Sequence, residues 1–364
     1  MNRIAFIGLG LIGGSIAKSI RRVHPEDYLY AYDISPVNLE AAVADGTVNE
    51  VLSCLDDRLR TCHFIFLCMP VNFMPDYLDQ IAPYLSKDCI LTDVGSTKTA
   101  IHQEICLRHL ESSFIGGHPM TGSEKSGYSA ATDRLLENAY YVLTPTNHTT
   151  SDGLSRMVHL VSDIGALPLE MDYEKHDYTV AGISHLPHII ASALVKLVKD
   201  SDSPDQTMKT VAAGGFKDIT RIASSSPVMW EHICLANRTN LATLLQEYIG
   251  SLEKILGEIT VGNGQAIFDL FAESGEYRNS ISERGSGPLQ KEYSLYCDII
   301  DRAGAIATIA TVLSVHQISI KNIGIIHNRE YEEGVLKIEF YEQTACIQAA
   351  DVLQANHYTV YPRK

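Results

Sequence analysis

The chain of 364 residues lacks features that several protein classes require. Its eight cysteines form no C-x-x-C pair, so neither a disulfide framework nor a zinc site is expected. The cysteines are instead expected to be reduced thiols in a cytoplasmic protein. A formal net charge of −15 argues against the basic face that nucleic acids and anionic membranes need. No apolar run approaches the roughly 20 residues of a membrane span. The negative net charge does not exclude a small anionic substrate, because a few local cations can outweigh it at a binding site.

A glycine-rich turn is the first chemical signal. An apolar run at residues 4–7 leads into GLGLIG, which places Gly8, Gly10 and Gly13 at the start of a helical pattern. These glycines suit a tight turn, the approach of a pyrophosphate, and close packing of helix on strand. Asp33 ends the next strand and would bind a ribose 2′-hydroxyl, which favours NAD over NADP. The alternative is a glycine turn in a doubly wound fold that binds no nucleotide.

Apolar segments alternate with helical patterns as far as residue 172. The runs at residues 64–70 and 89–96 are apolar throughout, as expected of strands covered on both faces. Their alternation with helices predicts a parallel sheet with crossovers. Ser35 and Pro36 predict a helix start, and Gly46 its end. Two further strands are expected to close a Rossmann-type doubly wound α/β domain over residues 1–172.

The remainder of the chain predicts two more domains. Helical patterns without strand signals indicate an all-α domain over residues 173–286, with an apolar stripe from Ile183 to Leu197. Residues 282–290 form a linker rich in glycine, serine and proline. Residues 291–364 then follow a β-α-β-β-α-β order, which is the ferredoxin-like unit.

The stretch GGHPMTGSEKSG, residues 116–127, fixes a histidine between glycines and a proline. It follows a short strand, so His118 is expected at the carboxyl edge of the sheet, where ligands bind. An imidazole there suits removal of a hydroxyl proton while a hydride leaves the same carbon. Glu124 is expected to hold the loop or to orient ligand groups. A purely structural loop histidine is the alternative.

The segment TDVGSTK, residues 92–98, ends a strand at the same edge of the sheet. Ser96 is therefore expected near a ligand. The alternative reading makes Ser96 a helix N-cap and Lys98 a solvated charge.

Two groups of side chains in the helical segment are candidates for substrate contact. His185 and His188 should point away from the apolar stripe, toward a cleft against the first domain. No carboxylate or cysteine accompanies them, so a metal site is not expected. Lys217 and Arg221 lie four residues apart and would clamp carboxylates, unless they form a salt-bridged surface helix. Trp230, the single tryptophan, is interpreted as a core or interface anchor.

Five motifs together resemble the prephenate dehydrogenase family. GLGLIGGS, TDVGSTK, GGHPMTGSEKSG, HDYTVAGISHLPH and GGFKDITRIASSSPVMW occur in the order and spacing of that family, over about the first 290 residues. The tail resembles an ACT domain, but Ala303 replaces the proline of the usual D-x-P-G turn. The tail therefore departs from the family pattern at the turn associated with effector binding.

The resemblance implies NAD-dependent oxidative decarboxylation of prephenate to 4-hydroxyphenylpyruvate, on the route to tyrosine. His118 would take the hydroxyl proton, Ser96 would orient the imidazole or a substrate oxygen, and Arg221 would bind a carboxylate. The resemblance also implies a homodimer joined through the helical domain, and tyrosine as an effector. Further substrate contacts are expected from His188, His185, Lys217, Glu124 and Trp230, the last of which would reach a partner's site. Cofactor contacts are expected from Gly8, Gly10, Leu11, Ile12, Gly13, Asp33, Met69, Pro70 and Ser96.

Three alternatives remain open. In the first, the substrate is arogenate, which carries an amino group where prephenate has a keto group. A β-hydroxyacid dehydrogenase would need a catalytic lysine on a helix, whereas this chain offers a histidine loop and SHLPH. A catalytically inactive regulator that senses NAD or tyrosine would not need His118, Ser96 and Arg221, which are all present.

Overall fold

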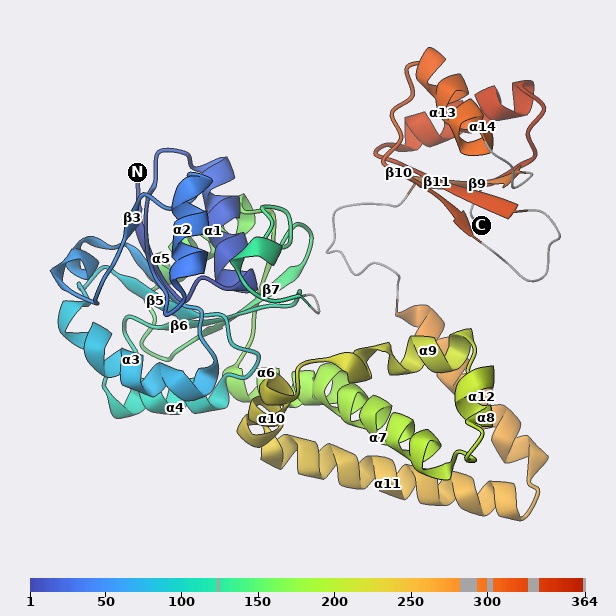
Figure 1. The fold of residues 1–364 in the computed structure, drawn as a ribbon, viewed down its shortest axis with the longest axis horizontal. Coiled ribbons are helices and arrows are strands. Elements are labelled where there is room, and N and C mark those ends of the chain that lie inside the picture. Colours follow the sequence, from blue (N-terminus) through green and yellow to red (C-terminus); the bar gives the residue numbers. More distant parts are fainter. Residues whose placement is uncertain (123–124, 282–292, 300–303, 327–333, 363–364) are drawn as a thin grey trace. The chain divides into compact units, whose positions relative to one another are not determined.

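The computed structural model describes residues 1–122, 125–281, 293–299, 304–326 and 334–362. Two compact units make up the chain, Met1–Gly287 and Pro288–Lys364. Within the first unit an α/β region is followed by a helical region (Figure 1). Three features named above, Glu124, the linker at residues 282–290 and Ala303, lie outside the described residues.

A five-stranded parallel sheet forms the centre of the α/β region. Its order is β3-β2-β1-β4-β5, as expected of a Rossmann-type sheet that winds outward in both directions from β1. Every residue of β4 and β5 is buried, because helices cover both faces. The strands are β1 (Arg3–Ile7), β2 (Tyr28–Tyr32), β3 (Glu50–Val51), β4 (Phe64–Leu67) and β5 (Ile90–Asp93).

Two apolar clusters form the core, one on each face of this sheet. Phe6 and Ile16 belong to one cluster, and Ile7 and Leu78 to the other, because successive strand residues face opposite sides. The helices are α1 (Leu11–Val23), α2 (Pro36–Ala44), α3 (Met74–Ile81), α4 (Thr99–Leu107) and α5 (Ser151–Asp163). Short 3-10 turns lie between them: η1 (Asp57–Thr61), η2 (Val71–Phe73), η3 (Ala82–Tyr84) and η4 (Tyr128–Ala130).

The next strands correct the prediction of a wholly parallel sheet. β6 (Ile115–Pro119), β7 (Tyr140–Pro145) and β8 (Leu167–Glu170) form a separate sheet in the order β6-β7-β8. β6 and β7 are antiparallel, because no crossover helix joins them among the described residues, whereas α5 lets β8 return parallel to β7. A parallel bridge between Leu91 and Phe114 places the start of β6 beside β5.

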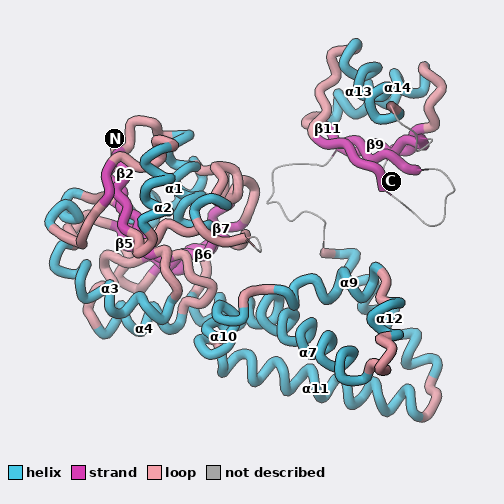
Figure 2. The backbone as a smooth tube through the Cα atoms, viewed as in Figure 1, coloured by secondary structure: helices cyan, strands magenta, loops and turns pink. Residues whose placement is uncertain are grey.

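Helices and the turns between them make up residues 173–281. They are α6 (Tyr173–Val180), the π-helical turn η5 (Ala181–His185), α7 (Leu186–Ser201), α8 (Thr207–Val211), α9 (Gly214–Thr220), the 3-10 turn η6 (Arg221–Ser224), α10 (Pro227–Ala236), α11 (Arg238–Thr260) and α12 (Gly264–Ser280). In Figure 2, α7 and α11 run lengthwise beside each other, and the two helices are in contact.

One continuous helix is longer and more apolar than expected, because no segment of the sequence was predicted to be able to span a membrane. Tyr173–Ser201, which contains α6, η5 and α7, is 29 residues long and is apolar enough, by length and composition, to cross a membrane. The sequence pattern missed it because polar residues interrupt the apolar run. Core helices of many other proteins satisfy the same two criteria, so this helix is weak support for a membrane span.

The second unit is a four-stranded antiparallel sheet in the order β10-β11-β9-β12. Its elements are β9 (Tyr293–Ile299), α13 (Ala305–Val315), β10 (Asn322–Ile326), β11 (Gly334–Phe340), α14 (Gln343–Ala355) and β12 (Val360–Pro362). Both helices pack on one face of the sheet, where Leu295, Ile309, Leu336 and Leu353 are buried (Figure 1). The β-α-β-β-α-β order is the one that the sequence predicts.

Candidate active site

The glycine turn has the geometry that a dinucleotide requires. Gly8 adopts a φ of +99°, and an added Cβ would lie 2.9 Å from the carbonyl carbon of Cys68. A Cβ on Gly13 would lie 2.6 Å from the carbonyl oxygen of Gly8, so only glycine lets α1 pack this closely. A Cβ on Gly10 would meet no heavy atom within 4 Å, which leaves room in front of the helix for a pyrophosphate.

Groups around this turn complete a fit to NAD. No side chain caps the first turn of α1, so the N–H groups of Leu11 and Ile12 are available to an anion. Asp33 follows β2, and its carboxylate accepts hydrogen bonds from the backbone N–H groups of Leu9 (2.5 Å) and Ser35 (2.7 Å). The Asp33 carboxylate is thereby held at the turn, where the ribose of a bound dinucleotide would lie.

Two other predicted features of this region can be placed. Met69 and Pro70 directly follow β4, and the Met69 nitrogen lies 3.2 Å from the position of a Cβ on Gly8. Ser35 occupies the N-cap position of α2, as predicted, but its side chain makes no capping hydrogen bond. The Asp33 carboxylate accepts a hydrogen bond from the backbone N–H of Ser35, and this bond stabilises the turn before α2.

Lys98 is fully buried, so its interpretation as a solvated charge is wrong. Its ammonium group donates hydrogen bonds to the Asp93 carboxylate and to the carbonyl oxygen of Gly117 (2.6 Å). Burial lowers the pKa of Lys98, and Asp93 opposes that shift. Lys98 also occupies the N-cap position of α4, so Ser96 is not the cap; Ser96 lies half-buried in the loop after β5. The buried ion pair fastens this loop to β6.

His118 lies inside β6, one residue before the end of the strand, rather than in the loop that follows. Its Nδ1 is 2.8 Å from Nε2 of His176 on α6. Burial lowers the pKa of His118 well below its usual range, and His176, Lys98 and His185 lower it further against the opposing effect of Asp177. The imidazole is therefore neutral at pH 7 and able to accept a proton.

His176, Asp177 and Asn237 are site residues that the sequence did not single out. Nδ1 of His176 is 2.9 Å from the Asp177 carboxylate, and both side chains are buried. The Asn237 amide nitrogen donates to the Asp177 carbonyl oxygen (2.7 Å) and to Nδ1 of His185 (3.2 Å). The adjacent histidine and aspartate of HDYT were the one available signal, since their contacts join residues far apart in the chain.

His185, His188 and Trp230 form an aromatic group in the helical region. The Trp230 ring stacks on His188 with centroids 3.7 Å apart and meets His185 edge-on at 5.9 Å. Burial lowers the pKa of His185 to about 4 and also lowers that of His188, whose Nδ1 donates to the Ser184 carbonyl oxygen (2.8 Å). Trp230 therefore packs on histidines of its own chain.

The apolar stripe has a different environment from that of the two histidines. Ile183 and Leu197 are largely exposed in the single chain, whereas His185 is buried. The π-helical turn η5 adds a residue to one turn of the helix, so the spacing of about 100° per residue does not hold across it.

The two predicted cations are separated by the end of α9. Arg221 begins η6, one residue after the helix ends, and both Lys217 and Arg221 are exposed. Burial has the largest effect on the pKa of His188, and the positive charge of Arg221 lowers it further. Arg221 therefore lies within electrostatic reach of His188. No described hydrogen bond or ion pair joins Lys217 to the histidines.

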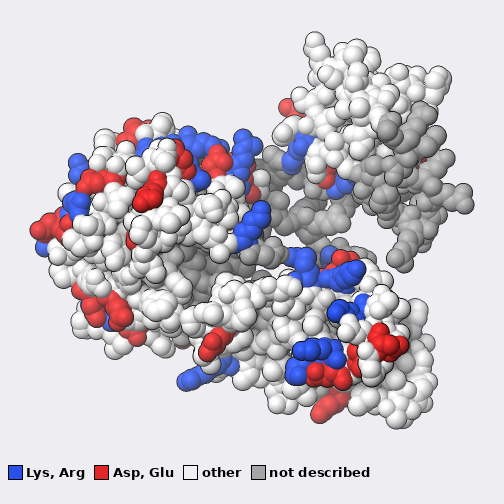
Figure 3. Space-filling model, in the orientation of Figure 1, with Lys and Arg blue, Asp and Glu red and all other residues white. Residues whose placement is uncertain are grey.

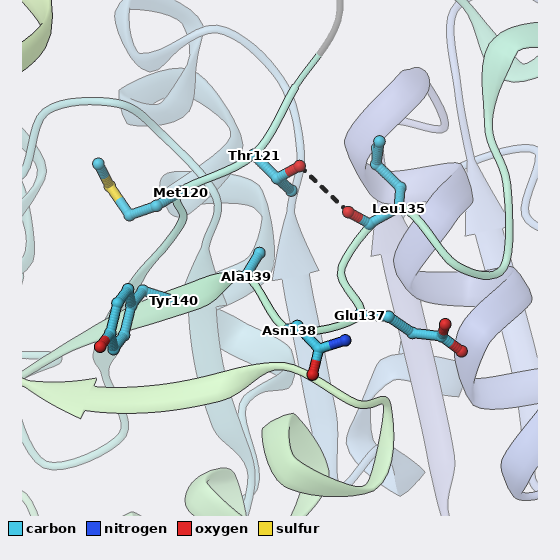
Figure 4. Close-up of a pocket in the computed structure, with 7 residues that line it drawn as sticks. All are labelled: Met120, Thr121, Leu135, Glu137, Asn138, Ala139 and Tyr140. Atoms are coloured by element: carbon cyan, nitrogen blue, oxygen red, sulfur yellow. Dashed lines mark hydrogen bonds between the residues drawn. The ribbon is translucent and has the colours of Figure 1, made fainter. Parts of the chain in front are cut away.

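A cavity of about 370 Å³ beside β7 is separate from these groups. In Figure 4 the ends of the Met120 and Glu137 side chains lie on opposite sides, and one hydrogen bond joins the Thr121 hydroxyl to the Leu135 carbonyl oxygen (3.1 Å). The Glu137 carboxylate is paired with Arg22 at 3.0 Å. The polar groups do not converge, so we assign no chemistry to this cavity.

Metal and charge add little to the site. Within the described residues, no group of three or more His, Cys, Asp and Glu side chains could hold a metal ion. All eight cysteines are free thiols. On the face drawn in Figure 3, acidic and basic side chains are interspersed over the α/β region.

Comparison with known proteins identifies relatives of the whole chain. Residues 16–168 match the family model of the prephenate dehydrogenase nucleotide-binding domain, and residues 172–273 match that of its dimerization domain. Prephenate dehydrogenase of Bacillus subtilis is 36% identical over 97% of this chain and 95% of the relative.

Solved structures agree with this result over about three quarters of the chain. Prephenate dehydrogenase of A. aeolicus, in complex with hydroxyphenyl propionate and NAD+, has a TM-score of 0.72 and 32% identity, and the match covers 78% of this chain and 99% of the other. Synechocystis arogenate dehydrogenase has a TM-score of 0.69 and 32% identity, with 76% and 99% covered.

Proposed function

The chain belongs to the prephenate dehydrogenase family, and from this premise we propose that it converts prephenate to 4-hydroxyphenylpyruvate with NAD+ as oxidant. The observation that carries the proposal is the neutral His118 imidazole at the carboxyl end of β6, next to a sheet whose glycine turn fits a dinucleotide. A regulator without activity would not need such a base.

The side chains have distinct roles in this reaction. His118 removes the proton of the ring hydroxyl, and Ser96 orients the imidazole or a substrate oxygen. When bound, NAD+ supplies the acceptor for the hydride of the same ring carbon, and loss of carbon dioxide then makes the ring aromatic. Arg221 binds a carboxylate of prephenate bidentately, and His188 lines the side-chain end of the substrate with His185 and Trp230. Lys217 is assigned to the same end of the substrate, and Glu124 is assigned to holding its loop or orienting ligand groups.

Cofactor binding is assigned to the turn between β1 and α1. Gly8, Gly10 and Gly13 with the N–H groups of Leu11 and Ile12 would hold the pyrophosphate, and Asp33 would hold the ribose. Met69, Pro70 and Ser96 would supply further contacts to the cofactor. Because the Asp33 carboxylate repels a 2′-phosphate, NAD is the cofactor in preference to NADP.

Formation of NADH with prephenate or arogenate tests the substrate. The two compounds differ by a keto or an amino group, and a relative 32% identical to this chain is an arogenate dehydrogenase. We expect NADH formation with prephenate at a higher kcat/KM than with arogenate. The reverse order would make the chain an arogenate dehydrogenase, and no NADH with either compound would contradict the proposal.

A homodimer is proposed to form through the helical region. Apolar side chains of η5, α7, α11 and α12 are exposed in the single chain, and the matching family model is a dimerization domain. Contact with a second copy would bury them, as the hydrophobic effect favours. The exposed set includes Ile183, Leu197, Leu252, Leu256, Ile259, Phe268 and Phe271.

The enzyme is proposed to act in the cytoplasm. Its second unit is proposed to be an ACT-like regulatory domain that binds tyrosine. Its β-α-β-β-α-β order and separate core support this reading. Tyrosine should inhibit the full chain, and a chain that ends at Ser286 should lose that inhibition while keeping turnover. Equal inhibition of both chains would place tyrosine at the active site instead.

A further inference from the structure

Two buried side chains beneath His118 have no part in the mechanism above. His176 and Asp177 are neighbours on α6, and each is 1% exposed. A continuous line of hydrogen bonds leads from Nδ1 of His118 to Nε2 of His176 (2.8 Å) and from Nδ1 of His176 to the Asp177 carboxylate (2.9 Å). The line therefore connects the expected base to a buried carboxylate.

The Asp177 carboxylate is held at the start of α4. It accepts hydrogen bonds from the backbone N–H groups of Lys98 (2.7 Å) and Thr99 (2.8 Å). Burial by itself raises the pKa of Asp177, but the hydrogen bonds from His176, Thr99 and Lys98 together outweigh burial, so its pKa lies below the ordinary value. Asp177 is therefore ionised at neutral pH and can only accept hydrogen bonds.

The direction of each hydrogen bond along the line follows from this ionisation. Because the carboxylate must accept, Nδ1 of His176 carries the proton, and its Nε2 holds a free electron pair. Nδ1 of His118 must then donate to that pair. The remaining ring nitrogen of His118, Nε2, is left without a proton, which is the state that a general base requires.

We propose that His176 and Asp177 are positioning residues that fix the tautomer of His118 and stabilise the imidazolium formed when His118 accepts a proton. This inference rests on the proposed function, since it concerns the base of that reaction. In comparable arrangements of histidine and aspartate, the wrong tautomer costs about 10⁴ in kcat.

A purely structural role for the pair makes a different prediction. Asp177 ties α6 to the start of α4, so its loss would weaken that contact whatever His118 does. The side chain of His176 makes no described hydrogen bond to α4, and its described hydrogen bonds are those to His118 and Asp177. Substitution of His176 therefore separates the two roles more cleanly than substitution of Asp177.

The experiment compares His176→Leu with His176→Gln in the full chain. Leucine cannot hydrogen bond, whereas glutamine offers an acceptor to His118 and a donor to Asp177. We expect kcat to fall by about 10² or more in His176→Leu and to stay within about tenfold of wild type in His176→Gln. NAD affinity should be unchanged in both variants. Equal losses in the two variants, or none in His176→Leu, would overturn the proposal.

The pH profile of kcat/KM supplies a readout that packing alone would not move. The groups facing His118 are His176 and Asp177 of α6, Lys98 after β5 with its partner Asp93, and His185 of η5. His176 itself lowers the pKa of His118, so both variants lose that effect, but only His176→Gln keeps a hydrogen-bonded link to Asp177. The acidic limb of the His176→Leu profile should therefore lie at lower pH than that of His176→Gln. Coincident limbs in the two variants would contradict the proposal.

A measurement on the wild-type protein keeps the proposal testable if the variants do not fold. ¹⁵N NMR of the histidine-labelled full chain, with the His118 signals identified from their absence in His118→Asn, should show a protonated Nδ1 and an unprotonated Nε2. The opposite tautomer would overturn the proposal. No substrate is needed, so failure to oxidise prephenate would refute the proposed function without changing this result.

Discussion

The α/β region and the helical region of the first unit differ in how far their apolar side chains are buried. In the α/β region these side chains are buried in clusters on both faces of the sheet. In the helical region few are buried, and Leu256 (64% exposed) and Phe271 (72%) lie at the surface. The α/β region therefore has a complete core of its own, whereas the helical region exposes an apolar surface of the kind that the proposed dimer would bury.

The largest expected effect comes from placing an aspartate on the exposed apolar surface of the helical region. Leu256→Asp would remove about 1.5–3 kcal/mol of burial from each copy, which in a symmetric dimer amounts to about 10²–10⁴ in the dissociation constant. Sedimentation equilibrium measures that constant. The matched control is Val37→Asp on α2, where the valine is 72% exposed in the α/β region and the same change should leave the assembly intact. An unaltered dimer of Leu256→Asp would place the interface elsewhere.

The second prediction concerns the α/β region alone. His118→Asn removes the proposed base without adding bulk, so kcat should fall by about 10²-fold or more. The dissociation constant of NAD should stay as in wild type, because the glycine turn follows β1, which belongs to a different sheet from β6. Stopped-flow NADH formation and a fluorescence titration measure the two quantities. Wild-type turnover in the variant would refute the role assigned to His118.

The third prediction tests the contribution of the helical region to substrate binding. Arg221→Ala should raise the KM for prephenate by roughly 10- to 100-fold, the value of a hydrogen bond between charged groups, with a smaller change in kcat. Lys217→Ala is the matched control, because Lys217 is an exposed cation one turn earlier with no described link to His188. Steady-state kinetics with the two variants decide the matter. An equal KM for both would dismiss a specific clamp.

The smallest expected effect is in the response to pH. His118 must be unprotonated to act as a base, and its pKa is lowered by burial and then by His176, Lys98 and His185. Protonation therefore begins only below the ordinary value of 6.5, and kcat/KM should be level from about pH 7 upward as far as His118 is concerned. A profile from pH 5 to 9 measures this. An acidic limb centred above 6.5 would mean that the site is more exposed than the structure describes.

Local sequence patterns determined much of this protein. The glycine turn with Asp33, the strands around it, the all-helical stretch and the β-α-β-β-α-β tail follow from spacing and residue type, because these features depend on neighbours a few residues away. The sequence also marked His118 and Arg221 as candidates.

The tertiary structure alone decided how these candidates are surrounded. Contacts across 58 residues join His118 to His176, and across 79 residues join Lys98 to Asp177, and no local period encodes such distances. Burial of Lys98 and the antiparallel pairing of β6 with β7 were missed for the same reason. A side chain has its charge, tautomer and exposure set by whatever the fold brings against it, and that is a property of packing in space.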